Sequence, residues 1–203
     1  MIDLATATFI GTEATDVEVL QMLPADYREF LLSVNGCILF GGGLHIRGAC
    51  EFPDWHSLRN VWTGSDALSS LYPSVEGGDV PFAQDACGDQ LLLRGELVVR
   101  LDAETGGITP LGLTWQEFFD AATMNPIEFL SLQPLVKFAA EGGKIQPGQL
   151  LSVYPPFCTT ESANSVSLKA ISALERIRFL ADFAKQIGHV PDGARIQIDV
   201  KGR

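Results

Sequence analysis

The chain is short of basic residues, and this shortage narrows the classes of partner that it can bind. Its 203 residues include 14 Lys and Arg against 25 Asp and Glu, for a formal net charge of −11. Proteins that hold nucleic acid or anionic lipid need a surplus of cations facing the phosphates. The composition therefore argues against both classes. Two interpretations of the acidity remain open: it keeps the protein in solution, or it complements a basic partner.

Closely spaced cysteines and long apolar runs are also missing. The four cysteines, Cys37, Cys50, Cys87 and Cys158, form no CxxC pair, whereas zinc sites usually show such tight spacing. We therefore expect buried free thiols in a reducing cytosol and no metal site. The opening MIDLATATFI lacks the basic start of a signal peptide, and no stretch approaches the ~20 apolar residues of a membrane span. These absences predict a cytoplasmic protein without a membrane partner.

No pattern typical of catalysis stands out. The glycines at 41–43 are followed by Leu44 and His45, where a phosphate-binding loop would need Lys and then Ser or Thr. His45 falls in an apolar stretch, His189 follows a helix end, and no GxSxG motif accompanies them. We expect the polar residues to make turns and cover the surface, with no reactive group set beside another. The sequence thus predicts neither an enzyme nor a cofactor.

Helix and strand signals are mixed along the first two thirds of the chain. Helices are indicated at 15–22, where Thr15 and Glu18 have capping-box spacing, and at 24–34, before the turn Asn35-Gly36. Two short strands are expected within 37–50, loop with some strand in 51–65, and a short helix in 66–72. An antiparallel meander follows, with strands at 90–94, 97–101 and 108–113, and a helix begins at Thr114.

The last third adds further helices and strands. Residues 126–141 predict one or two short helices, and 147–157 an extended segment. A long helix is predicted at 166–187, because Ile171, Leu174 and Ile177 begin an apolar stripe that ends before Gly188. Residues 194–200 alternate and predict a terminal strand. The expected fold is α+β: an antiparallel sheet flanked by helices in a core domain, 1–130, and a helical C-terminal extension, 131–203, packed on that core.

Acidic and aromatic residues supply the candidate binding positions. Asp85 and Asp89 flank Cys87, and Asp102 lies in the next turn. Turn chemistry accounts for such carboxylates, but two adjacent acidic loops could also do acid–base work or hold a divalent cation. Trp often anchors interfaces, although core packing is the alternative for each Trp in the acidic stretch. The candidate partner-binding residues are Glu51, Asp54, Trp55, Trp62, Asp85, Asp89, Glu96 and Asp102.

Three segments resemble motifs of one known family. LPADYREFLLSVNG (23–36) resembles the opening helix and turn of the SUKH superfamily, the Smi/Knr-type fold, VPFAQDACGDQLLL (80–93) its strand-turn-strand, and TWQEFFDAA (114–122) its closing helix. Their order and spacing agree over roughly residues 15–130. The resemblance implies an α+β fold without shared catalytic residues. It also implies a function, since many bacterial members are thought to bind and neutralise toxin domains, often nucleases or deaminases, while fungal relatives are regulatory scaffolds.

Three hypotheses follow for function. The first is an immunity-type inhibitor whose acidic surface blocks a basic toxin domain, with aromatic anchors at the centre of the contact. The second is a regulatory scaffold or interaction module that binds a partner other than a toxin. The third is an enzyme, metal-dependent or acting on a small molecule, built around Asp85, Cys87 and Asp89.

Overall fold

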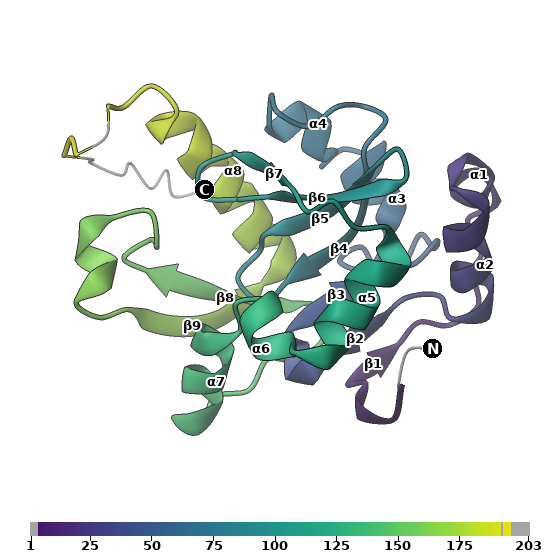
Figure 1. Ribbon diagram of the computed structural model, residues 1–203, viewed down its shortest axis with the longest axis horizontal. Coiled ribbons are helices and arrows are strands. Elements are labelled where there is room, and N and C mark those ends of the chain that lie inside the picture. The colour runs from purple at the N-terminus through teal and green to yellow at the C-terminus, as the bar shows by residue number, and fades with distance from the viewer. Residues whose placement is uncertain (1–3, 192, 196–203) are drawn as a thin grey trace.

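A seven-stranded antiparallel sheet forms the centre of the molecule (Figure 1). The structure is a computed structural model and describes residues 4–191 and 193–195. The strands follow one another in the sheet in the order of the chain, so the whole sheet is a meander. They are β1 (Phe9–Ile10), β2 (Cys37–Leu39), β3 (Leu44–Ile46), β4 (Val80–Asp85), β5 (Gln90–Arg94), β6 (Leu97–Leu101) and β7 (Ile108–Pro110). The predicted α+β class with an antiparallel sheet is confirmed.

Helices lie on both faces of this sheet (Figure 1). One face is covered by α1 (Val17–Met22), α2 (Ala25–Ser33) and α5 (Trp115–Met124), and the other by α4 (Leu68–Leu71) and α8 (Ala173–Ile187). The remaining helices are α3 (Leu58–Trp62), α6 (Pro126–Phe129), α7 (Gln133–Ala140) and the short 3-10 turns η1 (Leu4–Thr6), η2 (Phe40–Gly42) and η3 (Thr160–Ala163).

Strand β5 shows how one strand serves two cores. Its side chains alternate between the faces of the sheet, because successive residues of a strand point in opposite directions. Leu91 and Leu93 are buried in the cluster that contains Phe118 of α5. Leu92 is buried in the cluster that contains Ile177 and other residues of α8. The near-continuous apolar run of this strand therefore reflects burial on both faces.

The C-terminal segment brings its own small sheet. Strand β8 (Gln149–Tyr154) pairs antiparallel with β9 (Ser167–Ser172), and α8 follows directly. The backbone N–H of Leu151 donates to Ala86 O at 2.8 Å, which ties this hairpin to the end of β4. Leu150 also shares the second core cluster with α8. The division of the chain at residue 130 stays a prediction, but the segment after it completes one core of the sheet.

Three sequence-based assignments are wrong. The N-cap of α1 is Asp16, whose Oδ1 accepts from Val19 N at 3.2 Å, and not Thr15 as the capping-box spacing with Glu18 predicted. The helix predicted at 166–187 begins only at Ala173, because the alternation of Ser167–Ser172 lets this stretch pair along its whole length with β8. The stretch 51–65, predicted as loop with some strand, contains α3, whose N-cap Ser57 accepts from Asn60 N at 3.4 Å. The terminal strand predicted at 194–200 falls almost entirely on residues outside the described ranges.

Candidate functional site

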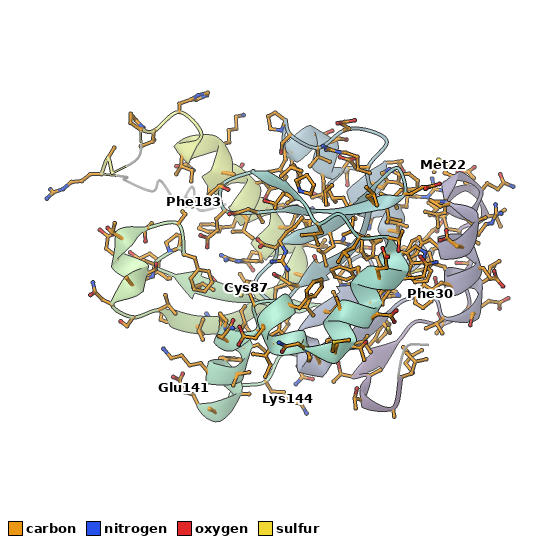
Figure 2. All side chains as sticks on the ribbon, viewed as in Figure 1. Met22, Phe30, Cys87, Glu141, Lys144 and Phe183 are labelled. Carbon is orange, nitrogen blue, oxygen red and sulfur yellow. The ribbon has the colours of Figure 1, made fainter. Side chains whose placement is uncertain are left out.

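A concavity that brings predicted site residues together lies where the sheet meets the C-terminal segment. It is a cavity of about 260 Å³. Figure 2 labels Cys87, one of its residues, near the middle of the molecule between the sheet and the β8–β9 hairpin. Two turns of the meander, the α6–α7 junction, the loop after β8 and α8 contribute the lining, which is made by Asp85, Cys87, Asp89, Asp102, Glu104, Ser131, Phe157, Cys158, Arg176 and Leu180. We call this concavity the acidic cavity.

The β4–β5 turn places the first two carboxylates. Asp85 Oδ1 accepts the backbone N–H groups of Cys87, Gly88 and Asp89 at 2.9–3.0 Å, which closes the turn around the carboxylate. Gly88 has φ +110°, and an added Cβ there would lie 2.7 Å from Leu180 Cδ1 on α8. Glycine therefore allows both the turn and the close approach of the helix.

The β6–β7 turn places the next two carboxylates. Asp102 Oδ1 accepts from the backbone N–H groups of Glu104 and Thr105, and Glu104 Oε2 accepts from Cys158 N at 2.9 Å. Asp89 Oδ1 joins the turns by accepting Ala103 N at 3.0 Å. In each aspartate one oxygen satisfies a turn, and no described residue hydrogen-bonds the other oxygen.

A buried arginine stands among these carboxylates. Arg176 of α8 is only 1% exposed, and its Nε donates to Cys87 O at 3.2 Å. Its Nη2 lies 3.8 Å from Glu104 Oε1, beyond hydrogen-bonding distance. Burial lowers the pKa of the Arg176 guanidinium, while Glu104 and its neighbours oppose that shift. One cation in the cavity lining thus faces four carboxyl groups.

The protonation of the carboxylates follows from this crowding. Burial raises the pKa of Asp85, although Arg100 and three backbone N–H groups favour its ionised form. Burial, and then the charge of Asp85, raises the pKa of Asp89 to about 8. Two interacting carboxylates give up their protons in steps that belong to the pair. The pair therefore holds a proton at neutral pH and could transfer it.

Two features bear on the enzyme hypothesis. Burial raises the pKa of the Cys87 thiol well above its ordinary value, which disfavours the reactive thiolate. Within residues 4–191 and 193–195, no three His, Cys, Asp or Glu side chains are grouped so that they could hold a metal ion. The acidic cavity offers proton transfer and cation binding, while neither an activated thiol nor a metal-ligand group appears in the described residues.

A second polar cluster joins strands β3 and β4 to the loop before α3. It contradicts the expectation that no reactive group is set beside another. His45 Nε2 and His56 Nδ1 are 2.9 Å apart, and both rings are buried. His56 Nε2 must donate to Asn35 O at 2.8 Å, so His56 Nδ1 accepts from His45, whose Nδ1 in turn accepts from Gln84 Nε2 at 3.1 Å. Arg47 closes the chain by donating to Gln84 Oε1. This chain is satisfied only when both histidines are neutral.

The sequence-predicted site residues fall in four separate places. Asp85, Asp89 and Asp102 line the acidic cavity. Glu51 and Asp54 are exposed on the loop before α3, with Trp55 half-buried against Phe9, 5.0 Å between ring centroids. Glu96 is exposed at the tip of the β5–β6 hairpin, and Trp62 is half-buried, its Nε1 inside without a hydrogen-bond partner among the described residues.

Sequence reasoning missed three residues of these places. Arg176 and Cys158 reach the acidic cavity from segments far along the chain, and no local pattern announces either contact. Phe52 is 75% exposed between Glu51 and Asp54. The signal for its exposure is its position in an acidic loop, because an apolar side chain there does not belong to the buried face of a helix or strand.

Fold and site together define a class: a small acidic α+β protein whose meander sheet carries helices on both faces and an acidic cavity at one end. The family model described as the SMI1 / KNR4 family (SUKH-1) matches residues 19–121, just over half of the chain. The chain belongs to the SMI1 / KNR4 family. The crystal structure of Atu4351 from Agrobacterium tumefaciens matches with a TM-score of 0.50 and 17% identity, over 85% of this chain and 81% of that one. This likeness shows the fold alone.

One further comparison and one property of the helices complete the description. No curated protein sequence matches the chain. No helix within the described residues has the length and apolar character that crossing a membrane requires.

Proposed function

We propose that the protein is an immunity-type inhibitor that acts in the cytoplasm, where it binds a basic toxin domain and blocks it sterically and electrostatically. Family membership supports a protein-binding role, and the uneven charge of the chain carries the proposal further. Residues 1–130 hold 19 acidic and 5 basic side chains, a net charge of −14, whereas residues 131–203 hold 6 and 9, a net charge of +3. An acidic half of this kind attracts a basic partner and orients it.

The few basic residues of the acidic half are mostly engaged within the protein. Arg47 is 1% exposed and bonds Gln84 and Gln90. Arg59 Nε donates to Asp16 at 2.6 Å, and Arg94 Nη2 donates to Asp79 at 2.7 Å. Two acidic residues are thereby neutralised by surface arginines. The exposed loop residues and the hairpin tip described above have no such counter-ion among the contacts of the described residues.

The loop before α3 has the layout of a small interface. Phe52 is exposed between Glu51 and Asp54 in the chain, and the neighbouring Trp55 packs against His45 and His56. A large apolar side chain at the centre lengthens the residence time of a complex, and charges at the rim accelerate its formation. Glu96 on the hairpin tip adds charge beside Leu97, which is 47% exposed. We propose this loop as one contact with the toxin domain.

Co-expression with toxin-like proteins encoded nearby tests the proposal. The wild type should restore growth against one of them and bind it with an association rate that falls as salt increases. The double variant Glu51→Lys/Asp54→Lys should protect less and associate more slowly. The matched control Glu141→Lys/Glu161→Lys changes the charge equally, but on exposed residues of the C-terminal segment, and should protect like the wild type.

Two outcomes contradict the proposal. If no neighbouring toxin candidate is neutralised, the protein is not an immunity protein. If a pull-down from unstressed cells recovers one stable partner that is not a toxin, the regulatory scaffold becomes the better explanation. Circular dichroism of all variants separates a lost contact from a lost fold.

A further inference from the structure

We propose that the acidic cavity is a binding site for an organic cation, and that it receives an Arg or Lys side chain of the protein partner. The inference rests on the proposed function for the source of that side chain. The cation site itself follows from the cavity, its unpaired oxygens and its charge, which are considered in turn.

The cavity walls present polar atoms that lack partners. Asp85 is only 6% exposed and lines the cavity, and its Oδ1 accepts three backbone N–H groups, while no described residue donates to its Oδ2. The same division holds for Asp89 and Asp102, whose Oδ1 atoms serve Ala103 N and the β6–β7 turn. These oxygens are reachable from the cavity, and none of them accepts a hydrogen bond from the described residues. A donor that enters the cavity would satisfy several of them at once.

The cavity lining contains too few cations to balance its carboxyl groups. Arg176 is the single cation in the lining, against Asp85, Asp89, Asp102 and Glu104. Its guanidinium keeps one hydrogen bond, to the carbonyl of Cys87, and stands 3.8 Å from Glu104. An additional cation would therefore be attracted into the cavity, and an anion would be repelled by its carboxylates.

The size and shape of the site favour an organic cation over a metal ion. A divalent ion needs oxygen ligands gathered at 2.0–2.6 Å, roughly, around one point, and the described residues contain no such group of three acidic, His or Cys side chains. A volume of about 260 Å³ is several times the ~30 Å³ share of one water molecule. A guanidinium with its alkyl stem fits this space and offers five N–H donors in a planar fork.

The cavity rim supplies a matching surface for such a stem. Phe157 lines the cavity and is 44% exposed. Aromatic faces attract ammonium and guanidinium groups, and more strongly once the cation is desolvated. Burial and the charge of Asp85 raise the pKa of Asp89 against the opposing charge of Arg100, so a further cation in the cavity would favour its ionised form.

Protection of Cys158 measures occupation directly. The expectation that the thiols are buried is wrong for Cys158, which is exposed at the cavity rim, whereas Cys37 and Cys50 are buried. Argininamide at millimolar concentration, a probe with the side chain of Arg, should slow alkylation of Cys158 by iodoacetamide in a saturable way. Citrullinamide has the same shape without the charge and should not protect.

A matched pair of variants assigns the protection to the carboxylates. Asp89→Asn/Asp102→Asn keeps the Oδ1 acceptors of both turns and removes two ionisable carboxyl groups that face the cavity. It should weaken protection by argininamide about 30-fold or more, the range expected when one partner of a buried charge pair is removed. Glu51→Gln/Asp54→Asn, which removes two exposed charges outside the cavity, should leave protection unchanged.

Several results would overturn the inference. Equal protection by argininamide and citrullinamide, no protection by either, or full protection in the Asp89→Asn/Asp102→Asn variant would each exclude a cation site. Growth rescue by that variant, equal to wild type, would show that the toxin does not use the cavity. Because the alkylation assay needs no partner, its failure is separate from failure of the immunity function, which the co-expression experiment decides.

Discussion

Replacing Asp89 by Asn should make the free energy of unfolding less sensitive to alkali. In the folded protein burial and the neighbouring Asp85 raise the pKa of Asp89 from 3.8 to about 8. A carboxyl group whose folded pKa is raised binds its proton more tightly in the folded state. Its stabilising contribution is complete below pH 3.8 and is lost as the pH rises through 8.

The size of the effect follows from the same two pKa values. Between pH 7 and pH 9 the wild type should lose about 1.4 kcal/mol through this group. Asn keeps the Oδ1 acceptor for Ala103 N but has no proton to lose, so the variant should lose less. Thiols with raised pKa, such as Cys37 at about 12, also titrate differently in the two states, but they are common to both proteins and cancel in the comparison.

Urea denaturation, followed by tryptophan fluorescence at pH 7, 8 and 9, measures this difference. Asp54→Asn is the control, because it removes an exposed carboxylate that does not line the acidic cavity. The control should lose as much stability as the wild type. If Asp89→Asn loses the same amount as the wild type over this range, the carboxylate pair does not hold a proton at neutral pH, and the reasoning about its electrostatics fails.

Two further predictions concern the folded state. Burial lowers the pKa of His56 to about 4, so the unfolded state takes up the proton first, and stability is lost as the pH falls from 6.5 towards 4. Protonation of His56 in the unfolded state should lower the free energy of unfolding by about 2 kcal/mol at pH 5 relative to pH 8. Urea denaturation of the wild type and of His56→Gln measures this contribution, because the cavity carboxylates are the same in both proteins. If the free energy of unfolding falls equally with pH in both, the prediction is refuted. Gly88→Ala should cost about 2–3 kcal/mol, because φ is +110° and the new Cβ meets Leu180. Gly95→Ala, at φ +65° in open space, should cost about 1 kcal/mol, and equal losses would exclude the contact with α8 as the cause.

Local signals predicted much of the fold, because they depend on neighbours in the chain. The helix predicted from Thr114 begins there, and Thr114 and Glu117 form a capping box with both reciprocal hydrogen bonds present. Gly95 has the positive φ of a tight hairpin between β5 and β6. The start of α8 was missed because Ser167–Ser172 pairs with a strand that the helical period does not reveal. Pairing with a distant segment outweighed the local helical preference.

The candidate site was only partly accessible from the sequence. The carboxylates Asp85, Asp89 and Asp102 were found because acidic turns are visible as residue types. Their convergence, and the presence of Arg176, depend on how α8 packs across the end of the sheet. No sequence pattern links His45 to His56, although β3 and the loop before α3 bring His45 Nε2 within 2.9 Å of His56 Nδ1. Periodicity identifies the buried face of an element but not the element that will cover it.

The two outermost strands of the sheet limit how a partner can be recognised. β1 has two residues and β7 has three, the last of which is Pro110. Short edges offer few backbone groups to an incoming chain, and proline removes a donor from one of them. Extension of the meander by a foreign strand is therefore disfavoured, as is stacking of copies edge to edge. Recognition is left to side chains on the faces and turns, where sequence can change without disturbing the hydrogen-bonded frame.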